Sequence, residues 1–365
     1  QETYGEDPYL TAAMAVPFIH GLQGDDPNAL KVAAAAKHYA VHSGPEADRH
    51  TFDAQVSQRD LYDTYLPAFE VAVKAGGVAG VMGAYNRTNG EACCASPTLL
   101  QQILRDEWGF AGHVVSDCEA ITDIYAHHKM VETPAQAAAL AVNNGCDLEC
   151  GCVFSALIDA VGQGLIDEAT INRSVGRLLE TRLRLGLGEA PEETPYAAIP
   201  AAVIDSDAHR ALALEAARES IVLLQNDGLL PLAKTIESVA VIGPNADDLM
   251  VLLGNYNGTP SQGATLLSGV RDKLAAGARL YYARGCPLAD GVPNIEPIPT
   301  ACLRPAAAEA GATGLTGAYF TADGLGSSVT SHEAPLDNLV HDPEPLCTRT
   351  AQVIDFVWKD MSPRT

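Results

Sequence analysis

The chain of 365 residues carries 46 aspartates and glutamates against 23 lysines and arginines, which gives a formal net charge of −23. This excess of negative charge repels nucleic acid and anionic membranes, so we expect neither as a partner and favour a neutral or weakly charged ligand. No apolar run approaches the roughly 18 residues that a membrane-spanning helix needs. The length suggests two domains, although an α/β barrel can use more residues in one piece.

The start of the chain indicates a fragment. The first residue is not methionine, and the sequence opens inside a dense polar motif that runs from Gln1 to Pro8. We therefore expect the native start, with any export signal, to lie upstream of Gln1. The compartment is left open, with a periplasmic or secreted location as one option.

The nine cysteines are too many to ignore and too few for a disulfide-built scaffold of this size. Cys146, Cys150 and Cys152 cluster with a spacing unlike that of paired zinc knuckles, and no histidine pair completes a site. We expect buried free thiols or one or two disulfides rather than a metal, and we predict no cofactor.

Strands and helices alternate in the first half of the chain. The apolar runs predict strands within 31–39 and at 77–84, 113–116 and 145–148, and helices at 60–75, 97–108, 134–143 and 168–187. Pro67 predicts a kink or a late start in the first of these helices. Such alternation favours a parallel sheet or barrel. Only about four βα units are visible, so a (β/α)8 barrel requires its first half upstream, and an open doubly wound sheet is the alternative.

The second half of the chain changes character twice. A linker at 189–206, whose first part is rich in Pro, Glu and Ala, separates a barrel part at 1–188 from a second α/β domain at 207–312. That domain is predicted to hold a helix from 207 to 224 and a strand from 238 to 243. Short β-like runs separated by turn residues then fill 313–365, including one at 355–358. This last stretch reads as the truncated start of an all-β module.

Three successive strand ends present chemically useful side chains. Lys37 with His38, then Tyr85, then Asp117 would meet at one edge, because the carboxyl ends of parallel strands lie together. Donors of this kind suit sugar hydroxyls, and a carboxylate can attack an electrophilic carbon. Each residue also has a structural alternative, such as Asp117 capping the helix that follows it. Their convergence is what favours a site.

Other chemistries lack their motifs. The sequence has no Gly-x-Gly-x-x-Gly after a strand, no phosphate-binding loop ending in Gly-Lys-Ser/Thr and no Gly-x-Ser-x-Gly elbow. His127 and His128 are adjacent, and neighbouring residues on a helix point in different directions, so we interpret them as surface residues.

Four motifs resemble those of family 3 glycoside hydrolases, and the resemblance covers about residues 1–300. They are Gln-Glu-Thr-Tyr-Gly-Glu-Asp-Pro at 1–8, Lys-His-Tyr-Ala-Val-His-Ser-Gly-Pro-Glu at 37–46, Val-Met-Gly-Ala-Tyr-Asn at 81–86 and Val-Val-Ser-Asp-Cys at 114–118. The resemblance implies the C-terminal part of a (β/α)8 barrel followed by an α/β sandwich domain. It also implies retaining hydrolysis of a β-linked glucose or xylose at the non-reducing end of a small oligosaccharide or glycoside.

The resemblance also suggests residue roles. Asp117 matches the family's nucleophile, Lys37 and His38 match residues that hold sugar hydroxyls, and Tyr85 matches the tyrosine beside the nucleophile. Arg49 and His50 are carried as further candidates that face the pocket.

Retaining hydrolysis needs a second carboxyl group about 5 to 5.5 Å from the first. In this family it usually comes from the second domain, and Leu-Thr-Gly-Ala-Tyr-Phe at 315–320 resembles the start of a PA14 module that some members carry there. We therefore expect the acid/base glutamate beyond Thr365 and assign none.

Two departures bear on the branch of the family. Cys118 after the nucleophile resembles the xylosidase pattern, and the stretch at 48–50 does not match the Asp-Ser-His triplet of the hexosaminidase branch. The alternative function is a carbohydrate-binding protein with a degenerate or incomplete glycosidase site.

Overall fold

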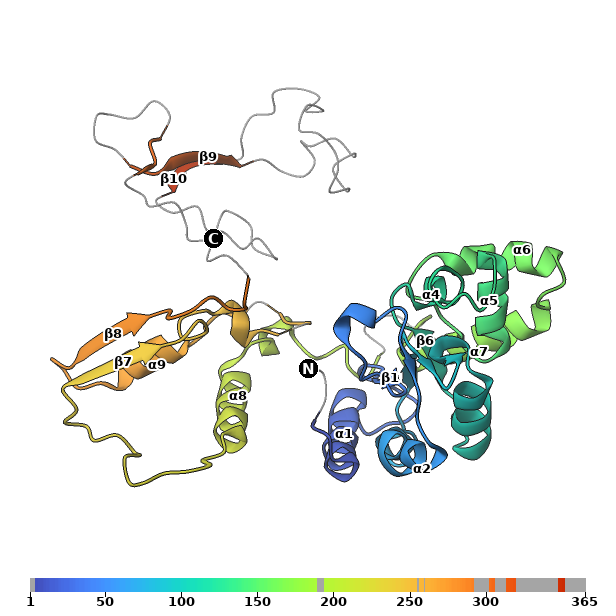
Figure 1. The fold of residues 1–365 in the computed structure, drawn as a ribbon, viewed down its shortest axis with the longest axis horizontal. Helices are drawn as coiled ribbons and strands as arrows, with labels where there is room; N and C mark the ends of the chain where they lie inside the picture. Colours follow the sequence, from blue (N-terminus) through green and yellow to red (C-terminus); the bar gives the residue numbers. More distant parts are fainter. Residues whose placement is uncertain are drawn as a thin grey trace. The chain divides into compact units, whose positions relative to one another are not determined.

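The computed structural model describes residues 4–188, 194–254, 256–258, 260–291, 302–305, 313–319 and 347–351. The chain divides into two compact units, Gln1–Ala201 and Ala202–Thr365 (Figure 1). This division falls inside the linker that the sequence predicts at 189–206, while the predicted domain bounds themselves stay predictions. Within the described part of the chain, no helix is both long and apolar enough to span a bilayer.

A parallel sheet lies at the centre of the first unit. Its strands are β1 (Ala35–Tyr39), β3 (Gly80–Gly83) and β6 (His113–Ser116), in that spatial order. Both pairings are parallel, and the spatial order follows the chain order without reversal. The register between β1 and β3 shifts between Ala36 and Tyr39, and the peptide bond between Lys37 and His38 is cis.

The fourth predicted strand, at 145–148, is wrong as a strand. Leu148 forms a single parallel bridge with Val115, and no ladder follows. The physical reason is Asp147, whose carboxylate accepts the hydrogen bond of the Val114 amide at 2.9 Å. A side chain thus occupies the place that a main-chain carbonyl would take in a regular strand.

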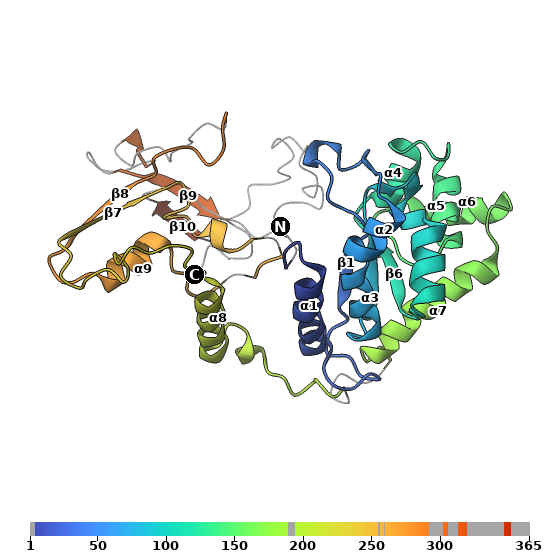
Figure 2. The same cartoon turned by 60° about the horizontal axis from the view of Figure 1, so that its bottom comes forward.

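Helices pack around this sheet (Figure 2). The helices predicted at 97–108, 134–143 and 168–187 form close to those limits, and the one predicted at 60–75 forms in three pieces, whereas the helices at 8–23 and 157–162 lie outside every predicted range. The helices of the first unit are α1 (Pro8–Gln23), α2 (Gln58–Asp60), the π-helix η2 (Leu61–Tyr65), α3 (Pro67–Lys74), the π-helix η4 (Pro97–Glu107), α4 (Ala120–Ala126), α5 (Pro134–Asn143), α6 (Leu157–Gly162) and α7 (Glu168–Arg184). Short 3-10 turns also form, η1 (Glu46–Asp48), η3 (Cys93–Ala95) and η5 (Val153–Ala156).

The helix starts have local causes. Pro67 has no amide hydrogen to donate, so the helical run that begins at Gln58 is interrupted at Leu66, and α3 begins at Pro67. The alternative of a late helix start is wrong, because helical turns already precede the proline. Thr133 and Gln136 form a capping box at the start of α5, and Asp167 caps α7 by accepting a hydrogen bond from the amide of Thr170.

The core of the first unit lies between the sheet and its helices. Val81 of β3 and Val114 of β6 are fully buried, as are Leu100 and Leu104 of η4. Burying one such side chain contributes about 1.5–3 kcal/mol. Tyr39 is also fully buried, and its hydroxyl donates to the carbonyl of Leu99 at 3.0 Å, which satisfies its polar end.

A small second sheet holds two loops beside the carboxyl ends of the main strands. β2 (Asp53–Ala54) pairs in parallel with β4 (Arg87–Thr88), which pairs antiparallel with β5 (Glu91–Ala92). β2 follows the loop that carries Arg49 and His50, and β4 follows Tyr85. The sheet therefore fixes both loops to one another.

The second unit contains a βαβ arrangement. β7 (Ser238–Ile242) pairs in parallel with β8 (Arg279–Ala283), and η8 (Met250–Leu252) and α9 (Leu266–Lys273) lie between them in the chain. α8 (Asp207–Ser220) precedes β7 and ends four residues before the predicted limit, because Ile221 is already extended. The 3-10 turn η7 (Ala201–Val203) spans the boundary between the two units. The second unit also holds β9 (Leu315–Tyr319), which pairs antiparallel with β10 (Cys347–Ala351). The run predicted at 355–358 lies outside the described residues.

Candidate active site

Asp117 lies directly after β6, at the carboxyl end of the sheet, and its amide donates to the carbonyl of Gly83 at 3.1 Å. Its Oδ1 accepts from the amide of Cys118 at 2.8 Å, and its Oδ2 lies 3.3 Å from Nε2 of His38. The side chain is 14% exposed. Glu119, not Asp117, occupies the N-cap position of α4 and makes no side-chain cap, so the helix-capping alternative for the Asp117 side chain is wrong.

His38 reaches Asp117 from within β1 rather than from after its end. Its side chain is 18% exposed, and its ring lies 4.8 Å from that of His42. Lys37 directly precedes His38 in the same strand and is half-buried. The register shift in β1 falls at these two residues.

Tyr85 follows β3 by two residues, and its phenol interacts with the carboxylate of Asp117, whose charge and hydrogen bonding act on it. Burial, followed by the negative charge of Asp117, raises the pKa of Tyr85 to about 12. The phenol therefore keeps its hydrogen at neutral pH, where it can donate to the carboxylate. On its main-chain side, the carbonyl of Tyr85 accepts from Nε2 of His128 at 2.9 Å.

Arg49 and His50 contact Tyr85 rather than Asp117. The guanidinium of Arg49 lies 5.6 Å from the centre of the Tyr85 ring, and the ring of His50 meets it edge-on at 4.9 Å. Arg49 also pairs with Glu46 at 2.7 Å, and this hydrogen bond raises the pKa of the guanidinium. The structure thus brings His38 and Tyr85 to Asp117, and Arg49 and His50 to Tyr85.

Asp123 of α4 is a residue that the sequence reasoning missed. Its side chain is 2% exposed, its Oδ2 lies 2.8 Å from Nδ1 of His50, and its Oδ1 lies 2.6 Å from Nδ1 of His127. The only available signal was the spacing of Asp123 and His127, four residues apart on one helix face. The interpretation of the adjacent histidines as surface residues is half wrong, because His127 is exposed whereas His128 is buried.

The cluster of His50, Asp123 and His127 offers the ligand types that a divalent metal prefers, with ligand atoms within 4.8 Å of one another. Two ligands of a tetrahedral zinc ion lie roughly 3.3 Å apart, given bonds of about 2.0–2.1 Å. The two nitrogen–oxygen distances of 2.8 and 2.6 Å are shorter and are those of hydrogen bonds. Hydrogen bonds between Asp123 and the two histidines therefore explain the cluster better than a bound metal.

A disulfide joins Cys118, next to Asp117, to Cys150. The amide of Cys150 donates to Oγ of Ser116, and its carbonyl accepts from the amide of Glu119. The sequence allowed one or two disulfides without naming a pair. A signal was present, because both cysteines closely follow neighbouring predicted strands and so lie at one edge of the sheet. This link holds the loop that carries Asp117.

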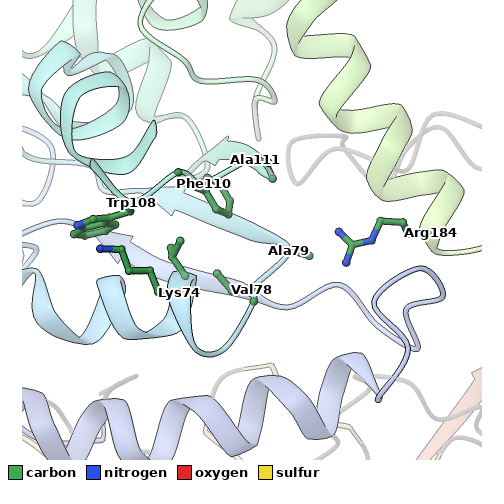
Figure 3. Close-up of a pocket in the computed structure, with 11 residues that line it drawn as sticks. Lys74, Val78, Ala79, Trp108, Phe110, Ala111 and Arg184 are labelled. Carbon is green, nitrogen blue, oxygen red and sulfur yellow. The ribbon is translucent and has the colours of Figure 1, made fainter. Parts of the chain in front are cut away.

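A hollow of about 400 Å³ lies at the opposite end of the same strands (Figure 3). Val78 and Ala79 precede β3, and Phe110 and Ala111 precede β6, so its lining comes from the amino ends of the sheet. Ligands of parallel α/β sheets bind at the carboxyl ends. We therefore place the candidate site at Asp117 and not in this hollow.

Models of one protein family match most of the chain. Residues 1–181 match the glycosyl hydrolase family 3 N terminal domain, and residues 221–349 match the glycosyl hydrolase family 3 C-terminal domain. A xylan 1,4-beta-xylosidase of Xylanibacter ruminicola is 45% identical over 88% of this chain and 37% of its own length. A beta-xylosidase/alpha-L-arabinofuranosidase of Medicago sativa subsp. varia is 42% identical over 79% of this chain and 38% of its own. The chain thus spans less than half the length of these relatives.

Solved structures give the same result. An exo-beta-xylosidase in complex with a xylobiose aziridine activity-based probe superimposes with a TM-score of 0.74 at 38% identity, over 80% of this chain and 38% of that one. A beta-glucosidase from Listeria innocua in complex with glucose gives a TM-score of 0.69 at 31% identity, over 79% of this chain and 40% of that one. These matches establish an α/β glycosidase fold. With an N-terminal and a C-terminal domain of the same family matched in order along it, the chain belongs to glycoside hydrolase family 3.

Proposed function

We propose that the complete protein containing this chain is a retaining exo-β-glycosidase, with Asp117 as its nucleophile. The observation that carries this proposal is the convergence of two side chains on one carboxylate at the end of β6. Nε2 of His38 lies 3.3 Å from Oδ2 of Asp117, and the phenol of Tyr85 interacts with the same carboxylate. A carboxylate with two neighbouring donors at the carboxyl edge of a parallel sheet suits attack on an anomeric carbon.

The chemistry follows from this geometry. Asp117 attacks the anomeric carbon to form a covalent glycosyl-enzyme, while a second carboxyl group protonates the departing oxygen and later activates water. Tyr85 and His38 hold the carboxylate in position before attack. Lys37 and His38 are proposed to hold sugar hydroxyls, with Arg49 and His50 at the margin of the site. The position of the acid/base glutamate beyond Thr365 stays a prediction.

For the architecture, we propose that the described strands form an arc of a (β/α)8 barrel. The parallel pairing of β1, β3 and β6, their spatial order and the parallel bridge at Leu148 support this, because a barrel requires neighbours to follow chain order. A doubly wound sheet reverses its strand order at one point, and no reversal occurs among the three described strands of this sheet. The α/β sandwich domain at 207–312 and the PA14-like module at 313–365 are proposed with it, supported by the parallel β7–β8 pair and the antiparallel β9–β10 pair.

We propose that the protein hydrolyses β-linked xylose in preference to β-linked glucose. The curated relatives described above are named as xylosidases, and Cys118 follows the nucleophile as in the xylosidase pattern. The substrate would be a small oligosaccharide or glycoside cut at its non-reducing end. Comparing kcat/KM for the xyloside and the glucoside of one leaving group tests the choice, and a higher value for the glucoside would reverse it.

The second candidate, a carbohydrate-binding protein that holds a sugar without cleaving it, is separated from the first by Asp117→Asn. The substrate is 2,4-dinitrophenyl β-xyloside, whose leaving group needs no protonation, so the result does not depend on the acid/base group. We expect kcat to fall by about a thousandfold or more while binding of xylose is kept. Asp159→Asn, at an exposed position in α6, is the matched control and should retain full activity.

If the unaltered protein hydrolyses this substrate and Asp117→Asn hydrolyses it equally fast, Asp117 is not the nucleophile. Xylose binding without any turnover of this substrate would favour the binding protein.

A further inference from the structure

Asp123 is a buried carboxylate whose two oxygens both have histidine partners. A buried negative charge is costly unless hydrogen bonds compensate it, and Nδ1 of His50 and Nδ1 of His127 supply them at 2.8 and 2.6 Å. These bonds require a hydrogen on Nδ1 of both rings. Asp123 thereby fixes the tautomer and the orientation of His50, as a carboxylate does for a histidine in many catalytic and metal sites.

His50 in turn connects Asp123 to the candidate nucleophile. Its ring meets the Tyr85 ring edge-on, with centres 4.9 Å apart and planes at 71°. Arg49 lies over the same tyrosine ring at 5.6 Å. The His50 ring therefore forms part of the surface that orients the Tyr85 ring. Because the phenol of Tyr85 interacts with the carboxylate of Asp117, a change in the orientation of His50 reaches the candidate nucleophile.

We propose that Asp123 is a positioning residue, which acts through His50 to hold the Tyr85 hydroxyl on the carboxylate of Asp117. This inference rests on the proposed function of Asp117. The carboxylate of Asp123 is 2% exposed and contacts His50 and His127 rather than Asp117, so we expect its effect on the rate of attack and not on sugar binding. The chain of contacts begins at Asp123 in α4, continues through His50 to Tyr85 after β3, and ends at Asp117 after β6.

The test uses the complete protein and 2,4-dinitrophenyl 2-deoxy-2-fluoro-β-xyloside, which traps the glycosyl-enzyme. Its inactivation rate constant and its dissociation constant are measured separately for Asp123→Asn, Tyr85→Phe and the double variant. We expect Asp123→Asn to slow inactivation about tenfold, with the dissociation constant changed less than about twofold. In the Tyr85→Phe background, the same substitution should have little further effect, because its route is already cut.

Two further variants guard the interpretation. His50→Leu at an exposed position should give the same loss, so it carries the test if Asp123→Asn does not fold. Asp159→Asn, the exposed control in α6, lies outside this set of contacts, and it should stay within about twofold of the unaltered protein.

If the effects of Asp123→Asn and Tyr85→Phe on the inactivation rate constant simply multiply, or if Asp123→Asn changes only the dissociation constant, the proposed role of Asp123 is wrong. Either result would leave the proposed role of Asp117 unaffected. Absence of label on Asp117 in the unaltered protein would overturn the proposed function, and this inference with it.

Discussion

At the scale of single residues, the phenol of Tyr85 is one of the donors beside the carboxylate of Asp117, together with the amide of Cys118. Burial and the charge of Asp117 disfavour the phenolate, which raises the pKa of Tyr85 to about 12. The hydroxyl is therefore protonated below that pH and loses its hydrogen only as the pH rises through about 12. Over the neutral range the phenol therefore keeps the hydrogen that it can donate to the carboxylate.

Tyr85→Phe removes this donor and leaves the ring in place. A hydrogen bond to a charged group contributes about 1.5–3 kcal/mol, so we expect formation of the glycosyl-enzyme to slow by about 10- to 100-fold. The measurement is the pre-steady-state release of dinitrophenolate from 2,4-dinitrophenyl β-xyloside. Unfolding by urea should be nearly unchanged, and a variant as fast as the unaltered protein would show that the Tyr85–Asp117 bond is dispensable.

At the scale of elements, the end of β3 is packed against the turn η3 that follows β5. A methyl group added at Gly83 would lie 2.7 Å from Sγ of Cys94, which is buried, and the carbonyl of Gly83 accepts the amide of Asp117. Overpacking a core contact of this kind costs about 1–3 kcal/mol. The close approach of β3 and η3 thus depends on a glycine.

Gly83→Ala should therefore lower the free energy of unfolding by about 1–3 kcal/mol and displace the Asp117 loop, which slows turnover. Gly176→Ala is the matched control, because nothing lies within 4 Å of a methyl group there and the position is inside α7. The control should gain about 0.5–1 kcal/mol from helix propensity. Urea unfolding of both variants checks this, and equal effects would contradict the packing argument.

The Cys118–Cys150 disulfide connects the loop after β6 to the loop after Leu148, across 32 residues of sequence. Closing a loop of this length stabilises a fold by about 3–4 kcal/mol in the chain-entropy account. Cys118→Ser with Cys150→Ser should lower the Tm and reduce turnover, because Asp117 precedes Cys118. Cys152→Ser, which removes an exposed free thiol, should change neither property. A double variant as stable as that control would show that main-chain bonds alone hold the loop.

The elements differ in how far the sequence predicts them. The strand at 113–116 and the helix at 134–143 match the structure, because glycine brackets the first and a capping box starts the second. The strand at 145–148 failed, because the Asp147 side chain replaces a main-chain partner. Asp123 was missed for a related reason: its partner His50 is 73 residues away, and periodicity carries no information on such pairs.

The site itself could be predicted only in part. Strand ends placed Asp117, Tyr85 and His38 at one edge, and the structure joins them there. That Arg49 and His50 contact Tyr85 follows from the small second sheet, whose pairing of two-residue strands leaves no pattern in the sequence. Their assigned roles stay predictions.

At the scale of the whole molecule, acid weakens the fold through buried histidines. Burial lowers the pKa of His113 and His128 below the ordinary value of 6.5. The unfolded chain therefore binds protons first as the pH falls, so stability is lost from about 6.5 downward until the lowered folded pKa is reached.

We expect the free energy of unfolding to fall between about pH 7 and pH 5, by at most about 1.4 kcal/mol per pH unit for each histidine. His128→Gln should flatten this dependence, whereas the exposed His209→Gln should not. Urea unfolding at both pH values provides the measurement. If His128→Gln leaves the pH dependence of the free energy of unfolding unchanged, His128 is not a source of that dependence.

The most direct test of Asp117 as nucleophile is covalent labelling of the complete protein. It is incubated with 2,4-dinitrophenyl 2-deoxy-2-fluoro-β-xyloside, digested, and the labelled peptide is mapped by mass spectrometry. We predict one fluoroxylosyl group per chain, attached to Asp117 and lost in Asp117→Asn. Label on any other residue, or turnover without a trapped intermediate, would contradict the account.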